Sequence, residues 1–167
     1  MIVMPPIVRT SSAVAILILA LGGVAPVAAQ KTTVDGNTLA PSKNPGVIRN
    51  QLTLAARFGH QALAGLEATS PDEPMPPEES VLQPARDTYV LIRAALASLQ
   101  HAKEGQRYPD PMIDLAYKKV FDAWNLSRVP VDRASSGGSS RREYLALAIP
   151  RLRQALSLVD QALILLP

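Results

Sequence analysis

Four stretches of this chain carry apolar side chains three and four residues apart, and this spacing predicts four amphipathic α-helices. We expect a first helix over residues 45–68, a second over residues 81–104, a short third over residues 110–128 and a long fourth over residues 140–166. Aromatic residues, which sheets favour, make up only 4% of the sequence. Because each helix has a single apolar face, the sequence predicts an all-α, up-down-up-down four-helix bundle.

Short local patterns predict where these helices begin. Asn44–Pro45 and Asp110–Pro111 each place a capping side chain directly before a proline, which is favoured in the first turn of a helix. Ser140 and Glu143 have the spacing of a capping box at the start of the fourth helix. Gly59 lies in the middle of the first helix's apolar face, where the missing side chain would let a neighbour approach closely.

Two prolines are expected to disturb the later helices. Pro130 should end the third helix at about Arg128, since a proline inside a helix removes one backbone hydrogen bond. Pro150 lies inside the fourth helix and is expected to kink it near Ala146.

Residues 1–29 have the three zones of a cleavable signal peptide. Arg9 lies in a leading zone without acids, Ala13–Leu21 is an unbroken apolar stretch, and small residues occupy Val27–Ala29. A membrane-spanning helix needs about 20 apolar residues, and Pro26 interrupts the stretch before that length. We therefore predict cleavage after residue 29, a periplasmic or extracellular mature protein and no membrane span after cleavage. An uncleaved anchor is the alternative.

The mature chain is expected to consist of a flexible lead-in over residues 30–44 and a helical-bundle domain over residues 45–167. The lead-in is polar and shows no periodicity. Residues 69–79 contain four prolines and four acids, so they should form a stiff, exposed connection between the first two helices.

Composition excludes several classes of protein. The sequence has no cysteine, so it has no disulfides, no thiolate nucleophile and no cysteine-bound metal. Its formal net charge of +3 is too small and too scattered to indicate a nucleic-acid partner.

The sequence offers no constellation for catalysis or for a cofactor. In a hairpin of the first two helices, His60 and His101 would differ in height by about 15 Å, from a rise of about 1.5 Å per residue, which is too far for one metal ion. The acid pairs lie mainly in the proline-rich connection, where nothing would bury them. We therefore expect no enzyme activity, no metal and no cofactor.

Four arginines near the start of the fourth helix form a candidate site for an anion or an acidic partner. Arg141 and Arg142 stand in its first turn, and Arg128 and Arg133 precede it. The exposed backbone amides at the start of a helix favour anions. A guanidinium group can bind a carboxylate or a phosphate through two parallel hydrogen bonds. The alternative is an ordinary solvated basic end.

Three aromatic residues of the third helix form a second candidate site. If the helix packs through Met112, Ala116 and Val120, then Tyr117 and Phe121 are turned outward beside Trp124. An exposed aromatic patch is typical of a protein-binding surface. The alternative is that the same residues belong to the core.

These observations favour an exported binding or accessory protein that acts through protein–protein interaction. The alternative is a carrier of a small apolar ligand or cofactor in the bundle interior, which would need a cavity between the helices.

Overall fold

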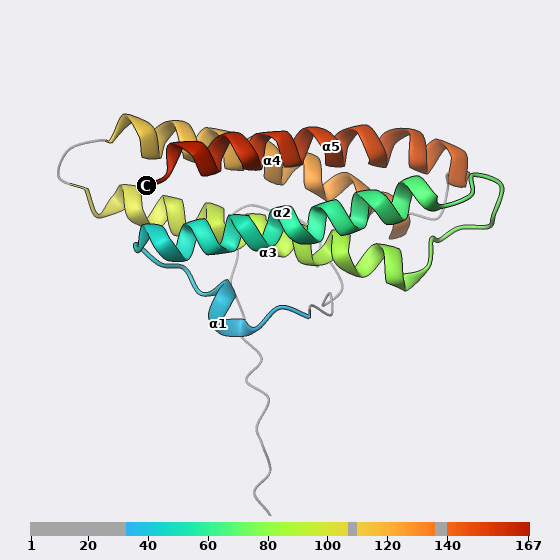
Figure 1. Ribbon diagram of the computed structural model, residues 1–167, viewed down its shortest axis with the longest axis horizontal. Helices are drawn as coiled ribbons and strands as arrows, with labels where there is room; N and C mark the ends of the chain where they lie inside the picture. Colours follow the sequence, from blue (N-terminus) through green and yellow to red (C-terminus); the bar gives the residue numbers. More distant parts are fainter. Residues whose placement is uncertain (1–32, 107–109, 136–139) are drawn as a thin grey trace, which may run out of the picture. The chain divides into compact units, whose positions relative to one another are not determined.

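The structure, a computed structural model, describes residues 33–106, 110–135 and 140–167 (Figure 1). All regular secondary structure in these ranges is helical, which confirms the predicted all-α class. The helices are α1 (Gly36–Leu39), α2 (Pro45–Ala68), α3 (Glu79–Glu104), α4 (Pro111–Ser135) and α5 (Arg141–Leu165). The predicted signal peptide lies outside the described residues. No helix in the described ranges is both long enough and apolar enough to cross a bilayer.

Local capping produces the predicted helix starts. The side chain of Asn44 accepts a hydrogen bond from the Gly46 amide over 2.9 Å at the start of α2. Ser140 and Glu143 form the reciprocal capping box at the start of α5. At the start of α4, Asp110 Oδ1 accepts from the Met112 amide over 2.8 Å. Each cap satisfies amides that lack a partner in the first turn.

The four long helices bury their apolar faces against one another. Helix α2 packs on α3 and α5, and α4 also packs on α3 and α5. Two clusters of buried side chains fill the space between them. One cluster centres on fully buried Leu52, Leu91 and Val159, and the other on Tyr144 and Leu152.

Gly59 allows α2 to approach both α3 and α5, as its place on the apolar face predicted. A Cβ atom built at Gly59 would overlap Leu156 Cδ2 of α5 and would lie 3.3 Å from Thr88 Cγ2 of α3. Since this contact is closer than real Cβ atoms tolerate, a larger residue at position 59 would force the Leu156 side chain to move.

The expectation of a short third helix is wrong. Helix α4 has 25 residues and continues through Pro130 to Ser135. Both Pro130 and Val131 are buried, and the Tyr144 hydroxyl donates a hydrogen bond to the Pro130 carbonyl over 3.0 Å. A proline inside a helix costs about 3 kcal/mol, while burying a valine side chain recovers about 1.5–3 kcal/mol. Packing against α5 therefore keeps this last part of α4 helical.

Helix α5 also contains a proline. It is helical from Arg141 to Leu165 and includes Pro150. These bounds do not test the kink expected near Ala146, which stays a prediction.

The segment before α2 is attached to the helices. Residues 33–44 lie within the lead-in that was expected to be flexible, and they contain the short helix α1. The Gln51 side chain of α2 donates to the carbonyls of Thr38 and Ala40. The Ser98 hydroxyl of α3 accepts from the Ser42 amide. The described part of the lead-in is thus held by the polar side chains of two helices.

Candidate functional site

Four aromatic side chains form a continuous strip where α3 and α4 meet. The ring centroids of Tyr117 and Phe121 are 6.4 Å apart, and those of Phe121 and Trp124 are 6.0 Å apart. Trp124 in turn stacks on Tyr89 of α3, with centroids 6.4 Å apart and an angle of 21° between the planes. These separations are typical of favourable aromatic pairs. We call Tyr89, Tyr117, Phe121 and Trp124 the aromatic strip.

Helical spacing places the strip beside the core. Tyr117, Phe121 and Trp124 are four and three residues apart, so they share one face of α4. Ala116 directly precedes Tyr117, and Val120 directly precedes Phe121. Both Ala116 and Val120 are fully buried and face the core. The strip therefore lies at the edge of the buried face, where α3 supplies the fourth ring.

Exposure differs among the three aromatic residues singled out from the sequence. Phe121 is 42% exposed, whereas Tyr117 and Trp124 are half-buried and pack against the core. The indole nitrogen of Trp124 is buried and has no hydrogen-bond partner. Buried donors without a partner are rare, and each one calls for an explanation.

A cation lies over a ring near each end of the strip. Lys103 Nζ lies 4.4 Å from the centroid of Tyr117. The guanidinium carbon of Arg128 lies 5.6 Å from the centroid of Trp124. Both distances are within the range of cation–π attraction. Arg128, predicted to belong to the basic cluster, is thus part of the surroundings of the aromatic strip.

Each of these two cations also has a carboxylate. Lys103 forms an ion pair with Asp114 over 2.8 Å, and Arg128 forms one with Asp132 over 3.3 Å. These pairs fix the cations in place beside the rings.

Arg141, the first arginine of α5, is buried and fastens the proline-rich connection. It is only 6% exposed, and its guanidinium pairs with Glu73 Oε2 over 2.6 Å. It also donates to the carbonyls of Pro74 and Pro76, while its Nε atom has no partner. The carboxylate that Arg141 binds is therefore in the chain itself.

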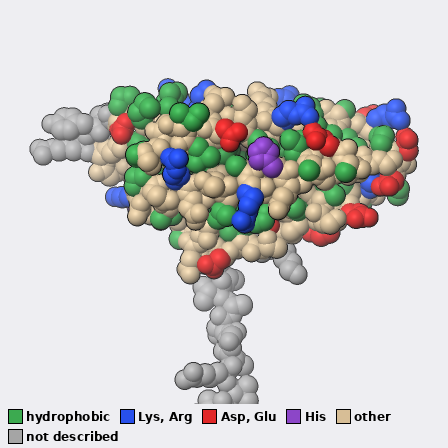
Figure 2. Space-filling model, viewed as in Figure 1, with side chains coloured by type: hydrophobic (Ala, Val, Ile, Leu, Met, Phe, Trp, Pro, Cys, Tyr) green, Lys and Arg blue, Asp and Glu red, His purple; other side chains and the backbone are tan. Residues whose placement is uncertain are grey.

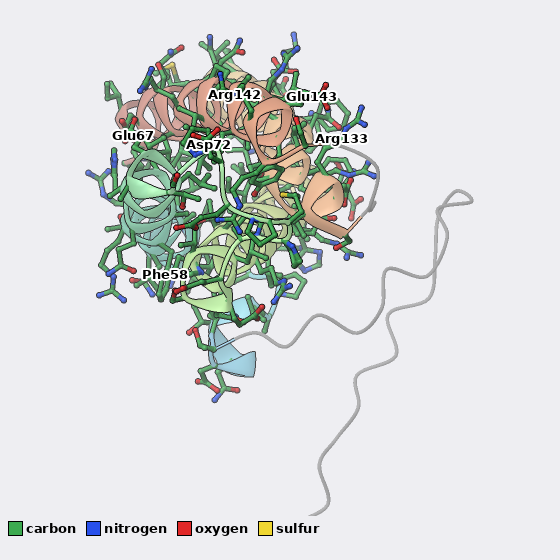
Figure 3. The ribbon with its side chains drawn as sticks, turned by 90° about the vertical axis from the view of Figure 1, so that its right-hand side faces the viewer. Phe58, Glu67, Asp72, Arg133, Arg142 and Glu143 are labelled. Carbon is green, nitrogen blue, oxygen red and sulfur yellow. The ribbon has the colours of Figure 1, made fainter. Side chains whose placement is uncertain are left out.

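The other two arginines of the predicted basic cluster are exposed. Arg142 pairs with Asp72 over 2.9 Å, and both side chains are exposed. Figure 3 labels the two residues in the end view of the molecule. Arg133 lies in the last turn of α4. Figure 3 also labels Arg133, on the side of the molecule formed by α4. Arg128, Arg141 and Arg142 thus each have a carboxylate of their own chain as partner.

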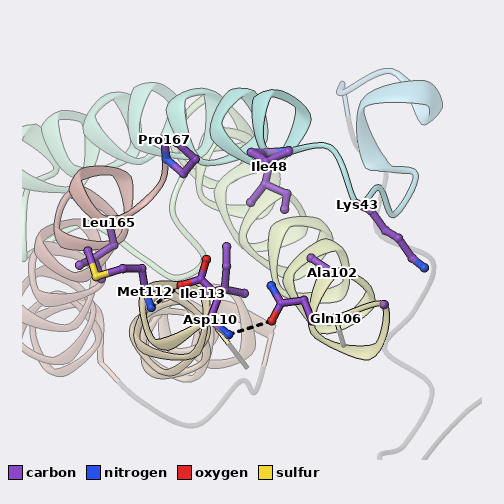
Figure 4. A pocket seen from close by; sticks show the side chains of 11 residues that line it. Lys43, Ile48, Ala102, Gln106, Asp110, Met112, Ile113, Leu165 and Pro167 are labelled. Carbon is purple, nitrogen blue, oxygen red and sulfur yellow. Dashed lines mark hydrogen bonds between the residues drawn. The ribbon is translucent and has the colours of Figure 1, made fainter. Parts of the chain in front are cut away.

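Two pockets lie at opposite ends of α2. The first has a volume of about 310 Å³ and an apolar lining that includes Ile48, Ile113 and Leu165, with Lys43 and Asp110 among its polar residues (Figure 4). The second has a volume of about 280 Å³ and lies beside Arg141, between the end of α2 and the start of α3. Neither of these two pockets is in the middle of the bundle.

The two histidines are exposed and belong to different helices, α2 for His60 and α3 for His101. In the ranges that the structure describes, no three His, Asp or Glu side chains are grouped closely enough to hold a metal ion. On the face shown in Figure 2, basic and acidic side chains are interspersed, without a patch of one sign.

Sequence reasoning missed the contribution of α3 to the aromatic strip. Tyr89 lies at helical spacing with the apolar residues of its helix, so the spacing predicts that it belongs to the core. Its stacking on Trp124 joins residues 35 positions apart in the sequence, and no local pattern contains that information.

Comparison of the chain with protein-family models, with curated proteins and with solved structures finds no match. Its function is therefore inferred from its own residues.

Proposed function

We propose that this chain is an exported, non-catalytic protein that acts by binding another protein through the aromatic strip. The observation that carries this proposal is the solvent-exposed ring of Phe121 within a stacked aromatic surface. Aromatic side chains contribute much of the binding energy of protein interfaces, because they bury a large area at low entropic cost.

The scaffold that we propose is an up-down-up-down four-helix bundle of α2 to α5, with α5 kinked at Pro150. Pairwise packing of α2 on α3 and α5, and of α4 on the same two helices, supports this arrangement. Export to the periplasm or the exterior rests on the three zones of residues 1–29.

The strip also indicates what a partner would supply. An apolar side chain of the partner would cover the exposed ring of Phe121. Lys103 and Arg128 are already paired with Asp114 and Asp132, so the aromatic rings set the main requirement on the partner. We therefore propose a partner that presents an apolar residue to Phe121.

The proposal predicts that Phe121→Ala weakens partner binding about tenfold or more, as truncation of a central interface residue does. Folding should be retained, since Phe121 is partly exposed. Mature protein would be used to capture proteins from its native compartment, and captured proteins would be quantified by mass spectrometry. Direct titration of a captured protein would follow the fluorescence of Trp124, the single tryptophan of the chain.

Ile164→Ala is the matched control, because Ile164 is an apolar residue of α5 that is 82% exposed. It should bind the captured partner as the unmodified protein does. Equal capture by Phe121→Ala and Ile164→Ala, or binding without any change in Trp124 fluorescence, would remove the aromatic strip from the proposal.

The alternative function, carriage of a small apolar ligand in the bundle interior, has weaker support. The two pockets described above lie at the ends of α2. The intact native mass of protein purified from its own compartment separates the two functions, because a carrier retains a small molecule.

A further inference from the structure

Three polar side chains on α2 and α3 are buried although they do not belong to the apolar core. Gln51 and Ser98 are fully buried, and Asp87 is 1% exposed. Polar groups are costly to bury unless they are hydrogen-bonded. Their bonds therefore show what this surface is built to hold, and in this structure it holds residues 33–42, which we call the arm.

Asp87 holds the first described residue of the arm. Its Oδ1 atom accepts from the Thr33 amide over 3.0 Å, and its Oδ2 atom accepts from the Thr33 hydroxyl. Gln83, one turn earlier on α3, donates to Asp87 Oδ1 over 3.1 Å. The carboxylate is thus oriented by its own helix and directed at an amide and a hydroxyl of the arm.

Gln51 and Ser98 hold the rest of the arm through its backbone. Gln51 Nε2 donates to the Thr38 carbonyl over 2.8 Å and to the Ala40 carbonyl over 3.2 Å. Ser98 Oγ accepts from the Ser42 amide over 3.1 Å and donates to Gln51 Oε1 over 3.0 Å. The side-chain network between α2 and α3 is therefore completed by main-chain groups of the arm.

Nearly all of these bonds are independent of the arm's side chains. Four of the five described above use backbone amides or carbonyls, and the fifth uses the Thr33 hydroxyl. Main-chain bonds of this kind can be made by many sequences, and they are a common basis of peptide recognition. The surface thus fits a polypeptide segment that carries a hydroxyl residue opposite Asp87.

Little apolar burial holds the arm in place. Helix α1 has no buried residue, and Val34 and Leu39 are only partly buried against the core. Figure 1 shows α1 beside α2 and α3, outside the four long helices. Since hydrogen bonds contribute little net free energy each, the arm belongs to the part of the fold that opens at low cost.

We propose that the surface carrying Gln51, Asp87 and Ser98 is a binding site for a polypeptide segment of another protein, with a threonine or serine at the position that faces Asp87. The arm occupies this site within its own chain and must be displaced before the other segment binds. This site is separate from the aromatic strip, and it does not depend on the proposed function.

A synthetic peptide with the sequence of residues 33–44, labelled at its carboxyl end, is the probe. Thr33→Pro in the full mature chain removes the amide and hydroxyl donors that Thr33 supplies to Asp87, and it changes no residue of α2 or α3. We expect the probe to bind Thr33→Pro about tenfold more tightly than the unmodified chain, because an occupied site lowers apparent affinity. Fluorescence polarisation measures the difference.

Two further variants test whether the probe uses this surface. Asp35→Asn is the control within the arm, because the Asp35 side chain makes no capping bond, and it should bind like the unmodified chain. Adding Asp87→Asn to Thr33→Pro should remove most of the gain. A probe with valine in place of its first threonine should bind several-fold more weakly. Equal binding by Thr33→Pro and the unmodified chain would overturn the proposal, as would a gain that survives Asp87→Asn.

Hydrogen exchange of the unmodified chain gives a second, independent test. The amides of Thr33 and Ser42 should exchange much faster than that of Leu52 in α2, because the arm opens without global unfolding. Arm amides that exchange only with global unfolding would overturn the proposal. The double variant Thr33→Pro/Phe121→Ala should bind the probe as tightly as Thr33→Pro alone. Failure of the aromatic-strip proposal can therefore be distinguished from failure of the arm-site proposal.

Discussion

At the scale of single residues, Gly59 and Tyr144 show how a few atoms set the distance between helices. Gly59 has no side chain where α2 meets Leu156 of α5. Tyr144 is 1% exposed, and its hydroxyl reaches the Pro130 carbonyl of α4. The packing at Gly59 depends on the absence of a side chain, whereas the packing at Tyr144 depends on a buried hydroxyl that is hydrogen-bonded.

Gly59→Ala should lower the free energy of unfolding by about 1–3 kcal/mol, the range of an overpacked core. The new methyl group overlaps Leu156, and the better helix propensity of alanine recovers at most about 1 kcal/mol. Urea denaturation measures the change. Gly65→Ala is the matched control on the same helix, because its Cβ would meet Val81 at 3.3 Å and requires only a small shift. A Gly59→Ala protein as stable as Gly65→Ala would contradict the close approach.

Tyr144 predicts a loss of stability at high pH. Burial raises the pKa of Tyr144 to about 12, although the positive charge of Arg141 acts in the opposite direction. Below pH 10 the hydroxyl is protonated in both the folded and the unfolded state. As pH rises from 10 towards 12, the unfolded state loses the proton first, and stability should fall by about 1.4 kcal/mol per pH unit. Tyr144→Phe should lack this fall.

Urea midpoints of the two proteins, measured from pH 8 to pH 11.5, check this prediction. At pH 8 Tyr144→Phe should be less stable by about 1 kcal/mol, because the Pro130 carbonyl loses its hydrogen bond. The difference between the two proteins should vanish near pH 11 and change sign by about pH 11.5, since the fall of about 1.4 kcal/mol per pH unit then exceeds the advantage at pH 8. A constant difference across the range would show that Tyr144 titrates alike in both states.

At the scale of helices and connections, long-range polar contacts determine the path of the chain. Arg141 at the start of α5 holds the connection that joins α2 to α3, through Glu73 and two proline carbonyls. Helix α4 extends past Pro130 because α5 covers its last turns. Neither feature follows from the local sequence, since each needs a partner from a distant part of the chain.

Arg141→Met should destabilise the protein by about 1–3 kcal/mol, since it leaves two carbonyls and a carboxylate without their donor. Arg142→Met is a closely matched control, because Arg142 and Asp72 are both exposed and such pairs contribute about 0–1 kcal/mol. Urea denaturation and the rate of proteolysis within residues 69–78 measure both effects. Equal behaviour of the two variants would show that burial of Arg141 does not hold the connection.

At the scale of the whole molecule, α3 links the two surfaces to which we assign binding. Asp87 and Ser98 hold the arm together with Gln51 of α2, while Tyr89 and Lys103 contribute to the aromatic strip and its surroundings with α4. The residues of the two proposed surfaces thus lie on different faces of α3, and we expect that one surface can be altered without changing the other.

Export predicts a defined mature chain. When the full sequence is expressed in a bacterium with a secretion pathway, the exported protein should begin at Gln30, because small residues precede that position. Intact mass and amino-terminal sequencing identify the first residue. Replacing Ala29 with a bulky residue should block processing, whereas the same replacement at Ser42 should not. A chain that keeps residue 1 would contradict the prediction.

The sequence by itself determined the helices and most of their starts. Apolar spacing, the caps at Asn44, Asp110 and Ser140, and the place of Gly59 act over a few residues, so a linear pattern contains them. The same spacing placed Tyr117, Phe121 and Trp124 on one face of α4.

Only the tertiary structure decided the contacts between distant residues. Arg141 meets Glu73 across 68 positions, and Thr33 meets Asp87 across 54. Such pairs form when helix packing brings their backbones together, and burial then determines whether a proline, an arginine or an aspartate is tolerated. That is why the length of α4, the partner of Arg141 and the attachment of the arm could not be predicted from spacing.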